Sequence, residues 1–309
     1  MEGPELFRAG RERRQRWTRV SYGLFVPAEA PEQARLHALA SRLHPGGGFT
    51  HLTAAQVLDW WLPPMPPGLP DFAAQDDFRN RPRRTELRII RTTPPPEISW
   101  VRGLPLAPCT DVLLALARHL GLLDLVVVLD AALHLGDVTH QGLAATLATR
   151  RAGVRNLRRA AALADRRAES AMETLLRVLH QVCEIPVEPQ YELWSRGIFV
   201  ARGDLRIVGR RVLHEYDGAG HRSKRRHQRD LRRDRDITRS GWIRRGYTDT
   251  EVLRRPIDIV RDADDTLGRP HDPDRLQAWY ALLRDSCFTP SGRAQLLRRL
   301  GLAPGRRVA

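Results

Sequence analysis

The apolar and polar positions of the first 62 residues predict short strands and amphipathic helices. Val20–Val26 has the composition of a strand. Pro31 suits the first turn of a helix, and apolar residues follow it at helical spacing, namely Leu36, Leu39 and Leu43. Thr53 is suited to N-cap a further helix that runs through Leu58.

Prolines interrupt this pattern, and nine of them fall between Pro63 and Pro96. Because proline fixes φ and lacks an N–H donor, we expect loops and short strands here rather than helix. One β-like segment, Glu86–Arg91, lies between the proline clusters.

From Thr110 onward the apolar residues recur at the spacing of helices. The predicted helices are one from Thr110, one over Leu122–Leu135, one capped by Thr139 and running through residue 148, and one over Arg155–Cys183. The last of these allows a break near Glu169. Asp124 and Asp130 lie inside the apolar second helix, and we interpret them as surface or capping residues rather than as ligands.

The pattern changes again after Cys183, where β-prone segments and helices alternate as in an α/β module. The expected elements are strands at Glu188–Trp194, Ile198–Val208, Val212–Tyr216 and Trp242–Tyr247, and helices at Ser223–Arg239 and Asp249–Asp262. The tail from Pro273 is predicted to be helical, with an end that frays after Pro304.

The chain is strongly basic, with a formal net charge of +15 over 309 residues. The segment Arg202–Arg245 holds 15 basic and 6 acidic residues, so it contributes +9 of that charge. A concentrated positive field favours polyanions, first nucleic acid and then acidic membrane surfaces. Codon bias is an alternative explanation for the excess of arginine, because Lys224 is the single lysine, but it does not explain the clustering.

The three cysteines, Cys109, Cys183 and Cys287, are far apart and form no CxxC pair, which argues against a disulfide framework or a zinc knuckle. The N-terminus lacks the apolar core of a signal peptide, and the most apolar run, Leu120–Leu135, is too short to span a bilayer. We therefore expect a soluble cytoplasmic protein with no membrane partner.

A hairpin is predicted around Gly209 and Arg210, which suit a two-residue type II′ turn with glycine first. This turn pairs each residue i with residue 419 − i, so Asp204 lies opposite Glu215 and Arg202 lies opposite Asp217. Because side chains alternate along a strand, the three carboxylates share one face.

Like charges directly opposite each other destabilise a sheet, so something should offset this repulsion. A divalent cation is the simplest candidate, since Mg²⁺ is held by one or two carboxylates together with substrate phosphate and water. The alternative is a solvated edge in which Arg202 and Arg206 neutralise the acids.

These acidic residues carry a family resemblance that covers about residues 165–255. The relevant segments are SAMETLLR (170–177), ARGDL (201–205), HEYDGAGH (214–221), DLRRDRD (230–236) and GWIRR (241–245). Their order and spacing resemble the very-short-patch-repair-like branch of the PD-(D/E)xK restriction-endonuclease-like superfamily. The resemblance implies a central mixed sheet flanked by helices, with Mg²⁺ or Mn²⁺ on Asp204 and Glu215 and support from Glu173.

One position departs from the superfamily pattern, because Asp217 stands where a lysine is usual. The very-short-patch-repair-like branch commonly shows this acidic version together with a nearby histidine, for which His221 is the local match. An imidazole titrates near neutrality and is suited to proton transfer. A nuclease fold without turnover is the alternative that this departure leaves open.

The highly charged helix follows directly after the acidic cluster. Its position predicts that it neutralises DNA phosphates without reading bases, through Arg222, Lys224, Arg225, Arg226 and Arg229. The alternative is a solvated face in which the arginines pair with aspartates of the same helix. Trp242, just beyond the helix, is interpreted as a core residue rather than a stacking surface.

The front half carries a second resemblance, through TRVSYGLFVP (18–27), FTHLTAAQVLDWWLP (49–63), VRGLPLAPCTDVLLALA (101–117) and LDAALHLGDVTHQGL (129–143). It is similar to actinobacterial AbiEi-type antitoxin-like proteins, in which the N-terminal unit is a winged-helix DNA-binding element. The resemblance implies DNA as a partner and a cognate toxin as a candidate partner, while the oligomeric state stays open. Cys109 stands where that family more often has arginine.

Both resemblances define an expected organisation of the α/β (α+β) chain. A winged-helix-like region with a proline-rich linker covers residues 1–105, a helical connector 106–164, a restriction-endonuclease-like domain 165–265 and a helical tail 266–309. The helix from Thr53 to Leu58 is the candidate recognition helix and offers Gln56, with a purely structural helix as the alternative. The two functions that follow are a Mg²⁺-dependent DNA endonuclease and a catalytically inactive DNA-binding regulator of antitoxin type.

Overall fold

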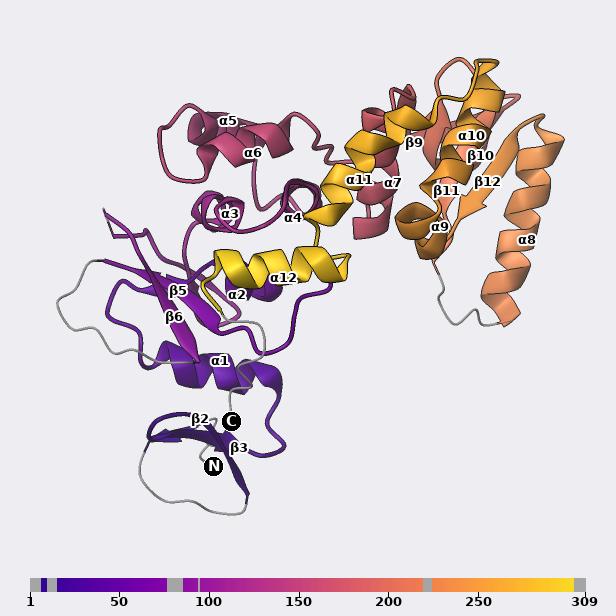
Figure 1. The fold of residues 1–309 in the computed structure, drawn as a ribbon. Coiled ribbons are helices and arrows are strands. Elements are labelled where there is room, and N and C mark those ends of the chain that lie inside the picture. The colour runs from indigo at the N-terminus through magenta and orange to yellow at the C-terminus, as the bar shows by residue number, and fades with distance from the viewer. Residues whose placement is uncertain (1–6, 10–15, 77–85, 94, 219–223, 303–309) are drawn as a thin grey trace.

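The computed structural model describes residues 7–9, 16–76, 86–93, 95–218 and 224–302, and for residues 8, 9 and 224–231 it describes the backbone alone. Helices and mixed sheets alternate along the chain, which confirms the α/β class (Figure 1). Among the described residues, no helix combines the length and the hydrophobicity needed to cross a lipid bilayer.

Two small sheets form the N-terminal part of the molecule. The first is antiparallel with the order β1-β3-β2, and the second is mixed with the order β6-β5-β4-β8-β7. Their strands are β1 (Arg8–Ala9), β2 (Trp17–Ser21), β3 (Leu24–Pro27), β4 (Gly48–Phe49), β5 (Asp71–Gln75), β6 (Leu87–Arg91), β7 (Ser99–Val101) and β8 (Leu104–Leu106). The predicted strand at residues 20–26 is divided by a turn at Gly23, where φ is 65°. The predicted strand at residues 86–91 is confirmed as β6.

Helix α1 (Glu32–Ala40) begins after Pro31 as expected, but α2 (His51–Val57) differs from its prediction. It begins before Thr53, whose hydroxyl bonds to the backbone N–H of Phe72 and to Asp71 instead of capping a helix. Every residue of α2 except Gln56 is buried. This burial favours the structural alternative, while a recognition helix that reads bases through the exposed Gln56 stays a prediction.

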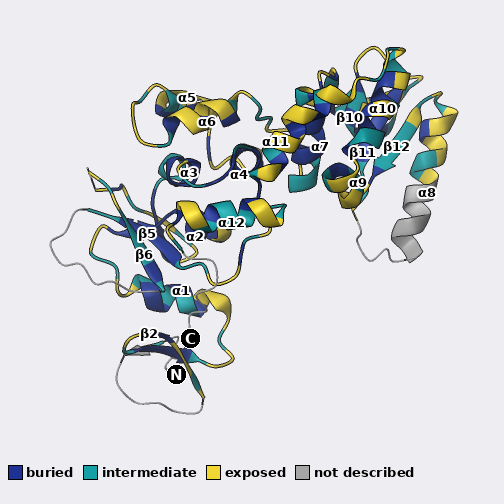
Figure 2. Cartoon of the chain, in the orientation of Figure 1, coloured by how far each residue is buried: buried dark blue, intermediate teal, exposed yellow. Residues whose placement is uncertain are grey.

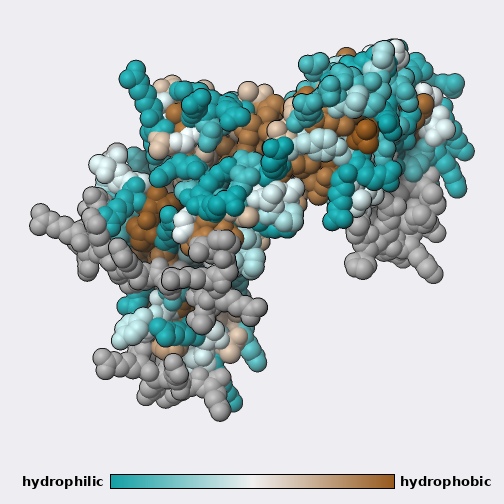
Figure 3. Space-filling model, in the orientation of Figure 1, coloured by the Kyte–Doolittle hydropathy of each residue, from teal (hydrophilic) through white to brown (hydrophobic). Residues whose placement is uncertain are grey.

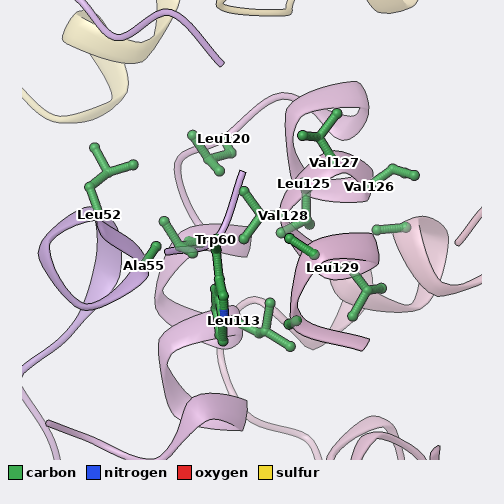
Figure 4. Packing of buried hydrophobic residues seen from close by; sticks show 14 of the residues in the cluster. Leu52, Ala55, Trp60, Leu113, Leu120, Leu125, Val126, Val127, Val128 and Leu129 are labelled. Carbon is green, nitrogen blue, oxygen red and sulfur yellow. The ribbon is translucent and has the colours of Figure 1, made fainter. Parts of the chain in front are cut away.

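Five helices occupy the middle of the chain, and α3 and α4 contribute many side chains to a core that extends from the N-terminal sheets to the last helices; Figure 4 shows part of it. They are α3 (Cys109–Ala117), α4 (Leu122–His134), α5 (His140–Leu147), α6 (Val154–Ala161) and α7 (Ala171–Val182). Thr139 caps α5, as predicted, by accepting a hydrogen bond from Gly142 N at 3.0 Å. The segment predicted as one helix over residues 155–183 is broken between α6 and α7, where Ser170 N-caps α7.

Asp124 and Asp130 are fully buried rather than at the surface, and both satisfy backbone N–H groups. Asp124 accepts hydrogen bonds from Cys287 N at 2.8 Å and from the Ser286 hydroxyl at 2.5 Å. Asp130 accepts a hydrogen bond from Asp165 N at 2.8 Å and forms an ion pair with the buried Arg177 at 2.6 Å. A surface location is therefore wrong, and neither side chain caps a helix, because the caps of α4, α7 and α12 are Gly121, Ser170 and Thr289; both carboxylates instead connect α4 to distant segments.

The C-terminal sheet has the order β12-β11-β10-β9, in which β11 and β12 are parallel and the other pairs antiparallel. Its strands are β9 (Val187–Ser195), β10 (Ile198–Ile207), β11 (Val212–Tyr216) and β12 (Ile243–Tyr247), and the charged helix is α8 (Lys224–Arg239). Helix α7 contacts β9 and β11, and α8 contacts β10 and β12. All of these elements were predicted, but a restriction-endonuclease arrangement of this sheet stays a prediction.

The chain then returns to the N-terminal half through α9 (Asp249–Arg254), α10 (Pro256–Leu267), a 3₁₀ turn (Pro273–Arg275), α11 (Leu276–Arg284) and α12 (Pro290–Arg299). Pro256 divides the single helix predicted over residues 249–262, because it cannot donate the hydrogen bond that would continue α9. Helix α12 packs against α11 (Figure 1). Its Arg299 donates to the His119 carbonyl at 3.1 Å, and the Leu300 carbonyl accepts a hydrogen bond from Arg88 of β6. The returning segments thus complete the core (Figure 2).

Candidate active site

The hairpin between β10 and β11 has the predicted register with a different turn. Leu205 pairs with His214 and Arg206 with Leu213, and both pairs sum to 419. The loop covers residues 208–211, and Arg210 N–H donates to the Ile207 carbonyl at 3.0 Å. Gly209 has a φ of 75° at the third position of this turn, as in type II rather than type II′. Since the loop is longer by one residue on each side, the register is preserved.

A cleft of ≈ 620 Å³ opens where β11 ends at Tyr216 and β10 continues past it. The sheet, α8 and β12 supply its walls, which include Arg202, Asp204, Glu215, Asp217, Arg233 and Arg244. Three of the predicted carboxylates therefore lie at one cleft. The face of the C-terminal sheet and its helices that Figure 3 shows is mainly hydrophilic.

Asp204 is held against the end of β11, where Tyr216 N–H donates to its Oδ2 at 2.8 Å. Burial raises the pKa of this carboxyl from 3.8 to about 7, and the nearby charges of Glu173 and Glu215 act in the same direction. The Tyr216 hydrogen bond and Arg233 oppose the shift only in part. Near neutral pH, Asp204 is therefore poised to gain or lose a proton or to accept a cation.

Glu215 is buried, and arginines bind both of its carboxylate oxygens. Arg233 of α8 donates to Oε1 at 2.7 Å and to Oε2 at 2.8 Å, and Arg244 of β12 donates to Oε2 at 2.6 Å. Arg233 also donates to the Arg202 carbonyl at 2.7 Å, which ties α8 to β10. Such charge-assisted, bidentate bonds fix the geometry of the carboxylate.

Asp217 continues the acidic face beyond β11. Its N–H donates to the Tyr247 carbonyl at 2.7 Å, and its carboxylate forms an ion pair with Arg244. Space for this carboxylate depends on Gly246, because a Cβ at residue 246 would lie 1.8 Å from Asp217 Oδ2. Arg244 therefore bridges Glu215 and Asp217 across a position that has no side chain.

Glu173 lies in the first turn of α7 and folds back over the N-terminus of that helix. It accepts hydrogen bonds from Glu169 N, the Ser170 hydroxyl and the Gln190 amide, each at 2.9 Å. Burial raises its pKa, although these hydrogen bonds oppose the shift. The negative charge of Glu173 raises the pKa of Asp204, so the protonation state of one carboxyl group affects the other.

His221 and Arg222 lie outside the described residues, and for Lys224, Arg225, Arg226 and Arg229 only the helical backbone of α8 is described. Their predicted contacts with DNA and the predicted proton transfer by His221 therefore stay predictions.

The sequence interpretation missed Arg233 and Arg244 as the cations of the cleft. The alternative of neutralisation by arginine named Arg202 and Arg206, but these pair with Glu169 and Glu188 instead. Arg244 stands beside Leu213 in the parallel register of β11 and β12, which places its side chain on the same face as Glu215. The sequence indicates this contact only if β11 and β12 are already known to be neighbours.

A chain of buried polar side chains lies on the opposite face of β11. His180 of α7 is hydrogen-bonded to His214 at 2.9 Å, and His214 approaches the Tyr247 hydroxyl at 3.3 Å. That hydroxyl donates to Asp262 at 3.0 Å. Burial lowers the pKa of His180 to about 4, and burial also holds that of His214 well below its usual range. Both imidazoles are neutral near pH 7, and they fix the strand that presents Glu215.

The donor set of the cleft fits a hard cation at Asp204, because burial and then the charges of Glu173 and Glu215 raise the pKa of this carboxyl and a bound cation would offset that cost. Glu215 fits only if an arginine releases one of its oxygens. Within the described part of the chain, no group of three or more His, Cys, Asp and Glu residues is arranged to hold a metal ion by side chains alone. Mg²⁺ or Mn²⁺ binding stays a prediction.

Comparisons of this chain with protein-family models, curated proteins and solved structures found no match. The case for a function therefore depends on the geometry of the cleft and on the chemistry of its residues.

Proposed function

We propose that the cleft binds a phosphodiester of DNA and that the protein is a Mg²⁺-dependent DNA endonuclease. One observation carries the proposal: Asp204, with a pKa of about 7, shares a cleft with Glu215, Asp217 and three arginines that line it. Paired acid and guanidinium groups suit a reaction in which a phosphate must be bound and a water deprotonated.

The arginines have a direct role in this proposal. A guanidinium matches the geometry of phosphate oxygens as well as that of carboxylate oxygens. Arg233 and Arg244 are partly exposed to the cleft, so each can turn from Glu215 to an incoming phosphate. Arg244 also brings positive charge to Asp217, the position at which the superfamily usually has a lysine.

Asp204 and Glu215 would hold the Mg²⁺, which supplies a polarised phosphate oxygen and a more acidic bound water. Glu173 supports Asp204 through its charge and its contact with Gln190. The proton released by the attacking water would pass to His221, because an unperturbed imidazole titrates near neutrality.

The test is a cleavage assay on supercoiled and linear DNA with Mg²⁺ or Mn²⁺. Asp204→Asn keeps the size of the side chain and an oxygen that can accept from Tyr216, so the rate should fall about 100-fold or more while the protein remains folded. Glu188→Gln is the matched control, because Glu188 pairs with Arg206 outside the cleft wall. Cleavage that survives in Asp204→Asn would refute the assignment.

The occupancy of both Glu215 oxygens by arginine favours a second candidate, a DNA-binding regulator of antitoxin type without turnover. In that case the wild-type protein cleaves no DNA in any metal, yet binds it in a salt-dependent manner. Arg233→Ala should then weaken binding, whereas Asp204→Asn should not. Co-purification with the product of a neighbouring toxin gene would support this candidate directly.

A further inference from the structure

The tip of the β9–β10 hairpin exposes large apolar side chains beside the cleft. Arg196 and Gly197 both have positive φ, 51° and 76°, as in a tight two-residue turn. Trp194, Ile198 and Phe199 around this turn are 56%, 70% and 49% exposed. A contiguous exposed apolar patch of this kind is typical of a binding surface.

The two aromatic rings are held in place by their neighbours. Trp194 lies directly opposite Phe199, with ring centroids 5.5 Å apart in an edge-to-face arrangement. The indole N–H of Trp194 donates to Glu192 Oε2 at 3.2 Å. Because these contacts already orient the two rings, the protein loses little side-chain entropy when a ligand stacks on them.

A β-bulge brings this pair to the cleft side. The pairing of β10 with β9 shifts by one residue between Phe199 and Ala201. A single extra residue reverses the alternation of side chains, so Phe199 shares a face with Arg202 and not with Ala201. Ala201 points to the other face, where it is buried in the small cluster around Leu213. Phe199 and Arg202 both line the cleft that contains Asp204.

We propose that Trp194 and Phe199 form a stacking platform for unpaired bases of the DNA strand whose phosphate lies in the cleft. This inference rests on the proposed function, because it takes DNA as the ligand of the cleft. Proteins that bind single strands combine a basic groove with exposed aromatic rings. Arg196 lies in the turn between Trp194 and Phe199, and Arg202, which is paired with Glu169, lines the same cleft as Phe199 together with Arg233 and Arg244.

The platform has a defined reach. Phe199 stands five positions before Asp204 on β10, with four residues between them, so the two are at most about 17 Å apart along the strand, and the bulge shortens this distance. At ~3.4 Å per stacked nucleotide, the platform meets bases within about five nucleotides of the phosphate at Asp204. The preferred substrate is therefore single-stranded DNA or a duplex with an unpaired extension next to that phosphate.

Binding is measured by fluorescence anisotropy without divalent metal, using labelled (dT)20, an abasic oligomer of equal length, and a blunt hairpin duplex with the same number of phosphates. Wild type should bind (dT)20 more tightly than either other probe. Trp194→Ala and Phe199→Ala should each weaken (dT)20 binding about five-fold to 100-fold and leave duplex binding unchanged. Trp194→Tyr, which keeps a stacking ring, should bind nearly as wild type does.

Trp100→Ala is the matched control, because Trp100 is 71% exposed beside a similar turn of positive-φ residues in the N-terminal sheet. Equal affinity for (dT)20 and the abasic oligomer, or no effect of Trp194→Ala, would overturn the platform. So would a loss of self-association in Trp194→Ala, measured by sedimentation, with unchanged DNA affinity, which would make the tip a protein contact. Trp194-dependent (dT)20 binding without cleavage in any metal would retain the platform and reject the endonuclease.

Discussion

Replacement of Asp204 by asparagine should stabilise the folded protein at neutral pH. In the native structure burial and the charge of Glu173 raise the pKa of Asp204 from 3.8 to about 7. The folded chain therefore binds more protons than the unfolded chain between pH 4 and pH 7, so this group makes stability fall as pH rises through that window. An amide has no charge to desolvate and retains an oxygen for Tyr216 N–H.

The magnitude follows from the shift. A change of about three pKa units at about 1.36 kcal/mol each gives an upper limit of about 4 kcal/mol at pH 8, reduced by relaxation and solvent near the cleft. Towards pH 4, where the carboxyl is protonated in the folded state and about half protonated in the unfolded state, the difference between Asp204→Asn and wild type should become small, and it should vanish at lower pH.

The assay is urea unfolding followed by far-ultraviolet circular dichroism at half-unit steps from pH 4 to pH 8, with Glu188→Gln as the control. The stability difference between Asp204→Asn and wild type should grow with pH and level off near pH 8. Addition of Mg²⁺ should stabilise wild type and not the variant, independently of any cleavage. A variant that is less stable than wild type at pH 8, or a difference that does not change with pH, would refute the reasoning.

Three further predictions concern the walls of the cleft and the face behind it. Arg244→Ala should destabilise the protein in urea unfolding by less than the about 3–5 kcal/mol typical of a broken buried ion pair, because Glu215 keeps its ion pair with Arg233. Adding Glu215→Gln should recover part of this loss, and no recovery would argue against the ion pair between Arg244 and Glu215. Gly246→Ala should cost about 1–3 kcal/mol through contact with Asp217, and Asp217→Gly should rescue it, so persistence of the defect would place the cause elsewhere. Because burial lowers the pKa of His180 from 6.5 to about 4, wild type should lose up to about 3 kcal/mol as pH falls from 6.5 to 4, and His180→Phe should flatten this dependence in thermal melts; an unchanged slope would contradict it.

The sequence predicted the site where local rules decide the structure. A short loop at Gly209 fixes a symmetric register, and alternation along β11 then places Glu215 and Asp217 on one face. The same rules do not reveal which arginines meet these acids, since Arg244 reaches them only through the parallel pairing of β12 with β11. With many arginines nearby, short-range pairing with Arg202 was an equally reasonable expectation.

The N-terminal helix shows a second limit of local reasoning. Thr53 is a good capping residue, but its hydroxyl bonds to Asp71 and Phe72 of β5, a strand 18 residues away whose position no local pattern indicates. Asp124 was ambiguous for the same reason, because its partners lie far along the chain. In both cases a polar side chain is satisfied by tertiary structure, which composition and periodicity do not report.

The partners of Asp124 have a consequence for how the protein is made. Its two carboxylate oxygens bind Ser286 and Cys287, 162 and 163 residues further along the chain. A nascent chain that has emerged only as far as β12 has every strand of the C-terminal sheet, but Asp124 is still without either partner. Assembly of the first half is thus completed by its last helices, so a ribosome that stops early leaves the cleft strands attached to an unfinished core.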